Sequence, residues 1–271
     1  MRFVVDGKDA FASTGGRPFD PTKPALVCVH GAGMDHTVWA MQTRYFAHHG
    51  WSVLALDLPG HGGSAGPALA TVEDMGAWVC RALQGAGARR SAFVGHSMGA
   101  LAALEAAAGS GDSALALLML GVVPTMAVHP DLQAAADAGN HRAVETMIGW
   151  GFGRPMQIGG NRAPGSWVSG AGLRVLERGL AGPLGSDLRA SNAYAGALAA
   201  AARVTCPTLV IAGDDDRMTP ARQAAPLVQA LPNGRTITLP RTGHMMSIER
   251  PDETLDAMRD FLAGIGQGVG Q

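Results

Sequence analysis

The stretch Ser91-Ala-Phe-Val-Gly95-His96-Ser97-Met98-Gly99-Ala-Leu101 decides how this chain of 271 residues is interpreted. A short apolar run leads directly into the pattern Gly-x-Ser-x-Gly, and an Ala/Leu-rich segment follows it. A strand that turns into a helix within so few residues strains the serine backbone, and glycine at 95 and 99 removes Cβ atoms that would collide. The pattern therefore predicts that Ser97 is presented at a helix N-terminus, where backbone N–H groups face developing negative charge.

Similar apolar runs recur along the chain and alternate with amphipathic segments. After an opening hairpin within residues 1–15, we expect strands at 25–31, 51–60, 91–97, 116–123, 207–216 and 234–244. We expect helices at 38–48, 72–83, 98–108, 220–231 and 251–263. Continuous apolar runs are typical of strands that helices cover on both faces. The alternation predicts an α/β fold with a mostly parallel eight-stranded sheet flanked by helices.

Residues 124–202 break this alternation. The segment holds no good strand, is rich in Ala, Gly, Met and Trp, and contains several short stretches of helical character separated by Gly and Pro. A structureless loop of this length is uncommon in a compact domain. We therefore expect a core domain made of residues 1–123 and 203–271, with 124–202 inserted as a helical cap above one edge of the sheet.

Composition excludes several classes of function. Lys and Arg number 21 against 22 for Asp and Glu, which gives no reason to expect nucleic acid as a partner. We expect no membrane span and no signal peptide, because apolar runs are too short. The three scattered cysteines, Cys28, Cys80 and Cys206, are interpreted as buried thiols of a cytoplasmic protein rather than as disulfide or metal ligands. The chain could be a monomer or a homodimer.

A serine hydroxyl needs a general base, and the base needs a carboxylate that orients it. His244 follows the last predicted strand, and Asp214, Asp215 and Asp216 follow the strand before it. The carboxyl ends of parallel strands share one edge of a sheet, so these side chains should meet Ser97 there. The chain order of serine, acid and histidine is the one expected for such a sheet. Adjacent aspartates point in different directions, so at most one of the three should reach His244.

The developing oxyanion requires two N–H donors near Ser97. The N–H of Met98 is one candidate, because it follows the serine at the start of the helix. The second is expected from the glycine-rich segment His30-Gly31-Ala32-Gly33 after an early strand, and we expect Ala32 to donate.

Together these motifs resemble the α/β-hydrolase superfamily, in its branch with a serine nucleophile and a helical cap. The resemblance rests on His30–Gly33, "DLPGHGGS" at 57–64, "GHSMG" at 95–99, "GDDDRMTP" at 213–220 and "TGHMMSIERP" at 242–251, in the order of the family. The family's acidic loop is similar to Gly213-x-x-Asp216-x-x-x-Pro220, which implies Asp216 as the acid. It also implies a structural role for His61.

The resemblance implies a carboxylesterase that cleaves esters or lactones through an acyl-enzyme, without metal or organic cofactor. C–C hydrolysis, perhydrolysis or haloperoxidase chemistry, amide cleavage, acyl transfer and ligand binding by a receptor remain alternatives with the same residues. Large apolar side chains in the insertion favour a hydrophobic small-molecule ester substrate. The expected substrate-binding residues are Gly31, His96, Met126, Trp150, Phe152, Trp167 and Met245. Arg142, Arg154, Arg162, Arg174 and Arg178 are weaker candidates for binding a substrate carboxylate.

Overall fold

The computed structural model describes residues 1–161 and 166–266, and an eight-stranded sheet runs through its centre. The strand order is β1-β2-β4-β3-β5-β6-β7-β8, antiparallel at β1 and β2 and parallel from β4 to β8. This arrangement confirms the predicted mostly parallel sheet. The strands are β1 (Arg2–Val5), β2 (Lys8–Ser13), β3 (Ala25–Val29), β4 (Ser52–Leu56), β5 (Ser91–His96), β6 (Ala114–Leu120), β7 (Thr208–Gly213) and β8 (Gly234–Leu239).

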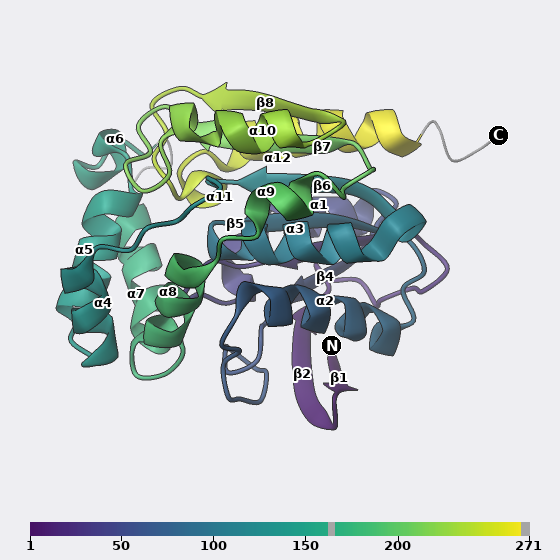
Figure 1. Ribbon diagram of the computed structural model, residues 1–271, viewed down its shortest axis with the longest axis horizontal. Coiled ribbons are helices and arrows are strands. Elements are labelled where there is room, and N and C mark those ends of the chain that lie inside the picture. Colours follow the sequence, from purple (N-terminus) through teal and green to yellow (C-terminus); the bar gives the residue numbers. More distant parts are fainter. Residues whose placement is uncertain (162–165, 267–271) are drawn as a thin grey trace.

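Helices cover both faces of the sheet (Figure 1). One face carries α2 (Val72–Ala86), α3 (Met98–Ser110), α9 (Ala197–Ala201) and α10 (Ala225–Ala230); the other carries α1 (Ala40–His48), α11 (Met246–Glu249) and α12 (Pro251–Gly266). The helix predicted at 220–231 is divided into a 3-10 turn and α10, whose first turn contains Pro226. The strand predicted to reach residue 244 ends at Leu239 because Pro240 cannot donate to the ladder.

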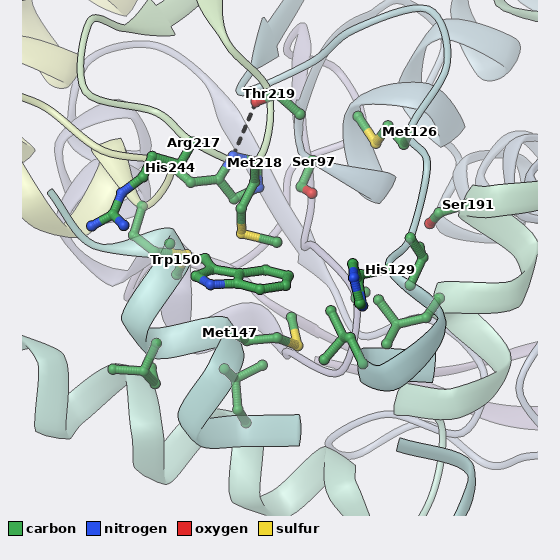
Figure 2. Close-up of a pocket in the computed structure, with 18 of the residues that line it drawn as sticks. Ser97, Met126, His129, Met147, Trp150, Ser191, Arg217, Met218, Thr219 and His244 are labelled. Carbon is green, nitrogen blue, oxygen red and sulfur yellow. Dashed lines mark hydrogen bonds between the residues drawn. The ribbon is translucent and has the colours of Figure 1, made fainter. Parts of the chain in front are cut away.

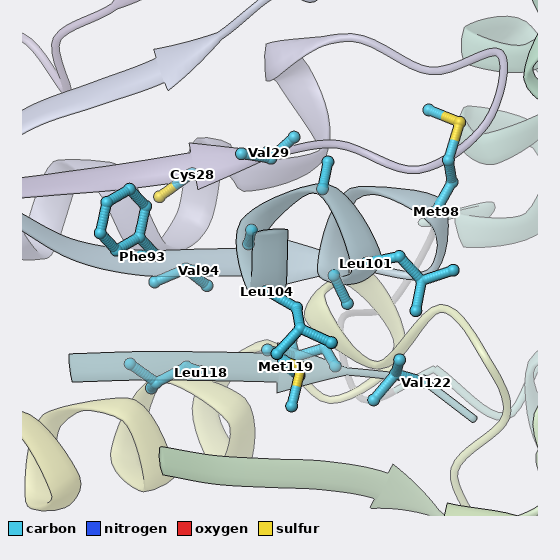
Figure 3. Packing of buried hydrophobic residues seen from close by; sticks show 14 of the residues in the cluster. Cys28, Val29, Phe93, Val94, Met98, Leu101, Leu104, Leu118, Met119 and Val122 are labelled. Atoms are coloured by element: carbon cyan, nitrogen blue, oxygen red, sulfur yellow. The ribbon is translucent and has the colours of Figure 1, made fainter. Parts of the chain in front are cut away.

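The hydrophobic core lies between β3, β5 and β6 and the helix α3 that crosses them (Figure 3). All residues of β3 and β5 are buried, as expected for parallel strands covered on both faces. Helix α3 is almost entirely buried, and Leu101 and Leu104 pack with Phe93 and Leu118 in the same cluster. This dense packing gives the turn at Ser97 a rigid support.

The segment between β6 and β7, residues 124–202, is called the cap from here on. Its described part contains α4 (Pro130–Asp137), α5 (Arg142–Gly151), α6 (Arg154–Gln157), α7 (Val168–Leu180), α8 (Leu184–Ala193) and α9, and no strand. Helices α4 to α8 gather at one end of the molecule, at the left in Figure 1. Helices α8 and α9 are separate, because the chain turns to an extended conformation at Tyr194. The assignment of the cap as a separate domain stays a prediction.

Two further expectations concern the cysteines and the membrane. Cys28 and Cys206 are buried free thiols, whereas Cys80 is half-buried on α2, so the expectation of three buried thiols is wrong for Cys80. None of the helices in the described ranges has the length and apolar character required to span a bilayer.

Candidate active site

Ser97 lies at the turn between β5 and α3 in a backbone conformation that residues other than glycine rarely adopt. Its φ of 54° and ψ of −123° lie outside the helical and extended regions. Its N–H donates to the carbonyl oxygen of Leu120 at 2.9 Å, which attaches the turn to β6. His96 and Met98 are buried on either side, but Ser97 is partly exposed and lines a pocket. The strain therefore accompanies an accessible hydroxyl, as at many functional sites.

Close backbone contacts explain the two glycines that flank Ser97. A Cβ on Gly95 would collide with the carbonyl oxygen of Gly99 in the first turn of α3. A Cβ on Gly99 would collide with the carbonyl oxygens of His30 and Val29 at the end of β3. Gly95 therefore allows α3 to approach the backbone of β5, and Gly99 allows α3 to approach the end of β3.

His244 lies in the loop after β8 and is 2 % exposed. Its Nδ1 is 2.8 Å from Asp216 Oδ2 and 3.1 Å from Thr219 Oγ1. Its Nε2 has no hydrogen-bond partner in the described part of the chain. Ser97 and His244 line the same pocket, and Figure 2 shows the two side chains on the same side of it. With the Nδ1–H donated to Asp216, Nε2 is left as a proton acceptor.

Asp216 is held in place by groups from its own loop. Its Oδ1 accepts the N–H of Met218 at 2.9 Å and of Thr219 at 2.8 Å, and its Oδ2 accepts the Thr219 hydroxyl at 2.6 Å. Burial alone would raise the pKa of Asp216, but the charge of His244 and the hydrogen bonds from His244 and Thr219 outweigh it. The pKa therefore lies far below its usual value, and Asp216 is a carboxylate at neutral pH.

The other two aspartates of this loop bind backbone groups instead of the imidazole. Asp214 Oδ1 accepts the N–H of Thr242 at 3.2 Å, next to the histidine loop. Asp215 Oδ2 accepts the N–H of Arg154 at 2.9 Å, at the start of α6. The structure thus brings one of the three adjacent aspartates, Asp216, to His244.

The two N–H groups expected to bind an oxyanion lie beside the pocket. Met98 is the first residue of α3, where an α-helix leaves N–H groups without an intrahelical acceptor. Ala32 lines the pocket, and its N–H has no acceptor among the residues that the structure describes. Gly31 lies beneath, where a Cβ would come within 3.0 Å of His96 Nδ1 and 3.4 Å of Ser97 Cβ.

The pocket has a volume of about 200 Å³ and opens between the sheet and the cap (Figure 2). Met126, Trp150, Phe152 and Met245 line it, and their contact with a substrate stays a prediction. The cap also contributes lining residues that the sequence did not predict as substrate contacts. They are Val128, His129, Leu132, Met147, Ile148, Leu176, Leu188 and Ser191. The lining is mostly apolar, which suits a hydrocarbon group rather than a charged one.

Three of the predicted substrate-binding residues are not in this lining. Trp167 is 70 % exposed at the start of α7, and Gly31 packs against His96 and Ser97. His96 is buried, and its Nε2–H donates to the carbonyl oxygen of His244 at 2.8 Å. Burial, together with the neighbouring His244, lowers the pKa of His96 to about 3. His96 is therefore a neutral support of the histidine loop.

The arginines named from the sequence also lie elsewhere. Arg174 pairs with Glu177, and Arg178 pairs with Asp35. Arg142 and Arg154 are not part of the pocket lining, and Arg162 falls outside the described residues. Arg217, which follows Asp216, is the arginine that does line the pocket, and it is exposed.

A buried carboxylate that the sequence prediction did not use joins the cap to the histidine loop. Glu249 is 4 % exposed, and its Oε2 accepts the N–H groups of Gly153 at 2.9 Å and Gly243 at 3.1 Å. Its Oε1 accepts the N–H of Met245 at 3.0 Å. Burial raises the pKa of Glu249 although these hydrogen bonds oppose the shift. The position within "GHMMSIERP" was visible in the sequence, but the partners were not.

No cluster of His, Cys, Asp and Glu within the described ranges has the arrangement of a metal site. The pocket instead combines a strained serine, an oriented imidazole and free backbone N–H groups. Such a set can activate a hydroxyl and stabilise a negative oxygen.

The strand order and the turn at Ser97 between β5 and α3 are those of an α/β-hydrolase fold. The model of the alpha/beta hydrolase family matches residues 26–257, and the chain belongs to this family. It is accordingly an enzyme of the hydrolase class.

Individual relatives share about a quarter of their residues with the chain. The (E)-2-((N-methylformamido)methylene)succinate hydrolase of Acinetobacter baylyi is 25% identical over 88% of this chain and 89% of its own length. The pimeloyl-[acyl-carrier protein] methyl ester esterase of Nitrosomonas europaea is 25% identical over 85% of this chain and 92% of its own. The crystal structure of an enol-lactonase from Burkholderia xenovorans superposes with a TM-score of 0.83 at 22% identity, covering 97% of this chain and 100% of that one. That structural likeness concerns the fold.

Proposed function

We propose that this chain hydrolyses carboxylic esters or lactones through an acyl-enzyme on Ser97. One observation carries the proposal: Asp216 holds His244 by Nδ1 at 2.8 Å, and the free Nε2 belongs to a pocket that Ser97 also lines. An imidazole held in this tautomer is a base for the serine hydroxyl.

The reaction follows from these positions. His244 Nε2 takes the proton of Ser97 Oγ as that oxygen attacks the carbonyl carbon, and the N–H groups of Ala32 and Met98 hold the oxyanion. The tetrahedral intermediate collapses, and His244 returns the proton to the departing alcohol. A water molecule, deprotonated by His244, then attacks the acyl-enzyme and releases the acid and Ser97. Asp216 stays ionised throughout and stabilises the imidazolium.

The pocket lining supports a small to medium hydrophobic substrate. Met126, Met147, Leu176 and Leu188 offer apolar surface on the cap side of Ser97. A hydrocarbon acyl group would bury its methylenes there, each contributing about 0.8 kcal/mol. The name of the Nitrosomonas relative, a methyl ester esterase, is in line with this choice of bond.

Cleavage of an amide-type C–N bond is the second candidate. The Acinetobacter relative is named for hydrolysing an N-methylformamido compound, and the same triad would serve such a bond if His244 protonates the nitrogen that leaves. C–C hydrolysis, perhydrolysis, acyl transfer and ligand binding by a receptor become the alternatives if neither esters nor amides are cleaved.

A panel of p-nitrophenyl esters from acetate to decanoate, assayed with wild type and Ser97→Ala, tests the proposal. We expect wild type to turn over and the variant to lose roughly 10⁴-fold or more in kcat. If the folded wild type and variant are equally inert, or equally active, the ester proposal fails. Matching p-nitroanilides then decide whether the amide is the better substrate.

A further inference from the structure

The loop that carries the Ala32 N–H packs directly against two helices of the cap. A Cβ on Gly179 of α7 would collide with the carbonyl oxygen of Gly33. A Cβ on Gly33 would lie 2.8 Å from Leu184 Cδ1 of α8. The backbone of this loop therefore lies directly against the backbone of α7 and against the Leu184 side chain of α8.

A buried carboxylate of the cap binds the backbone of the same loop. Asp187 of α8 is 0 % exposed, and its Oδ2 accepts the N–H of Gly33 at 2.8 Å. The same oxygen accepts His61 Nε2–H at 2.8 Å. Asp187 Oδ1 has no partner among the described residues. The carboxylate thus accepts hydrogen bonds from one backbone N–H and one imidazole.

The contacts of His61 favour the positively charged form of its imidazole. Both of its ring nitrogens face acceptors, Asp187 Oδ2 at 2.8 Å and the carbonyl oxygen of Pro59 at 3.0 Å, so both donate. Burial lowers the pKa of His61, but the hydrogen bond and charge of Asp187 outweigh burial, and the pKa is raised. The charges of His61 and Asp187 therefore compensate each other inside the protein.

The peptide on the other side of Ala32 is held by a second histidine. His30 Nδ1–H donates to the carbonyl oxygen of Gly31 at 2.9 Å, and His30 Nε2 accepts the N–H of Leu58 at 3.1 Å. Ala32 thus lies between two fixed peptide groups. His30 holds the peptide that contains the Ala32 N–H, and Asp187 holds the next one, which contains the Gly33 N–H.

We propose that Asp187 is a positioning residue of the oxyanion hole, supplied by the cap. By binding the Gly33 N–H it fixes the Ala32–Gly33 peptide and so the direction of the Ala32 N–H. A buried ion pair adds little net stability, but its hydrogen bonds fix geometry, and catalysis depends on donors that are held in advance. The inference rests on the proposed function, and it makes a closed cap a condition for full transition-state stabilisation.

A matched pair of variants isolates this hydrogen bond. Removing either partner alone leaves the other buried without its counter-charge, so His61→Ala and Asp187→Ala can each fail to fold. The test therefore compares His61→Ala/Asp187→Asn with His61→Ala/Asp187→Ala, neither of which buries an unpaired charge. The two proteins differ in the acceptor for the Gly33 N–H. The measurements are kcat and KM for p-nitrophenyl butyrate and the inhibition constant of butylboronic acid. Ser97 Oγ adds to the boron and its proton passes to His244, so the anionic tetrahedral adduct places one of its hydroxyl oxygens in the oxyanion hole.

We expect His61→Ala/Asp187→Ala to have a kcat at least tenfold below that of His61→Ala/Asp187→Asn, with KM changed by less than about twofold. Boronic acid binding should weaken by a similar factor. The asparagine of His61→Ala/Asp187→Asn keeps an oxygen that accepts the Gly33 N–H, so this variant should keep most of the kcat that His61→Ala/Asp187→Ala loses. Equal kcat and equal boronic acid binding in the matched pair would overturn the proposal.

Arg178→Met is the control for general loosening of the cap. It removes the ion pair between Arg178 and Asp35, another link of the cap to this loop, without touching the peptides around Ala32. Its kcat should stay within about twofold of the wild-type value. A loss of kcat as large as that of His61→Ala/Asp187→Ala would contradict a specific role for Asp187. Failure of the proposed function is distinguishable, because wild type and Ser97→Ala would then have the same activity.

Discussion

Asp216 Oδ2 and His244 Nδ1 lie 2.8 Å apart, and the opposite ring nitrogen of His244 has no partner among the described residues. The first contact fixes the tautomer, and the second leaves one nitrogen available to Ser97. Asp216 is itself held by Thr219, whose hydroxyl lies 2.6 Å from Asp216 Oδ2 and 3.1 Å from His244 Nδ1. Asp216, His244 and Thr219 therefore form one buried hydrogen-bonded group.

Asp216→Asn should lower kcat for p-nitrophenyl butyrate by about 10⁴-fold with a small change in KM, because the amide favours the wrong tautomer of His244. Asp215→Asn is the control, since Asp215 binds the N–H of Arg154 instead of the imidazole. Steady-state kinetics of both variants check this prediction. A full loss in Asp215→Asn, with activity retained in Asp216→Asn, would reassign the acid.

Gly121→Ala should disturb the position of His244. Gly121 has a φ of +58°, and a Cβ there would lie 2.9 Å from His244 Nδ1. Displacing the ring by a fraction of an ångström should lower kcat by roughly ten- to a hundredfold. Gly139→Ala is matched, because Gly139 has a φ of +61° and nothing within 4 Å of its Cβ position. Both variants should lose about 1–2 kcal/mol of stability, measured by urea unfolding, but Gly139→Ala should keep its activity.

The acyl pocket should be measurable as a chain-length profile. Each methylene that becomes buried should raise kcat/KM about fourfold, until the pocket is full. Met147→Trp should end this rise at a shorter chain and leave the acetate ester unaffected. Trp167→Ala should not change the profile, because Trp167 is 70 % exposed and outside the lining. A profile altered by Trp167→Ala and unaltered by Met147→Trp would contradict this description of the pocket.

The ion pair of His61 and Asp187 should make the free energy of unfolding depend on pH. The pKa of His61 is raised in the folded protein, so its contribution is fully present below the unfolded pKa of about 6.5 and is lost as pH rises through the folded value. Urea unfolding of wild type and His61→Gln from pH 5 to 9 measures it. The difference in unfolding free energy should be largest at low pH and shrink above neutrality. A difference that grows with pH would show that His61 is neutral in the folded state.

The sequence predicted the fold because its signals are local. The apolar runs predict β3, β5 and β7 because each strand is buried along its own length. The glycines around Ser97 are required by contacts within the turn or with a neighbouring strand. The choice of Asp216 over its neighbours came from family resemblance, since strand geometry alone left all three open. That choice remains a prediction, supported by the contact with His244.

The cap and its contacts could not be predicted in the same way. Which face of each cap helix meets the pocket depends on how the helices pack together, and Trp167 and Leu188 are equally apolar in the sequence. Asp187 has no motif around it, and its partner Gly33 lies 154 residues earlier. Such long-range hydrogen bonds leave no periodic pattern, so they become visible only in the folded structure.

The most direct test of this account is to trap the acyl-enzyme. Wild type is mixed with p-nitrophenyl butyrate, quenched in acid within milliseconds, digested and analysed by mass spectrometry. The account predicts a butyryl group on the peptide that contains Ser97, formed at the rate of the p-nitrophenol burst and absent in Ser97→Ala. Hydrolysis by wild type without acylation of Ser97, or with the acyl group on another residue, would contradict it.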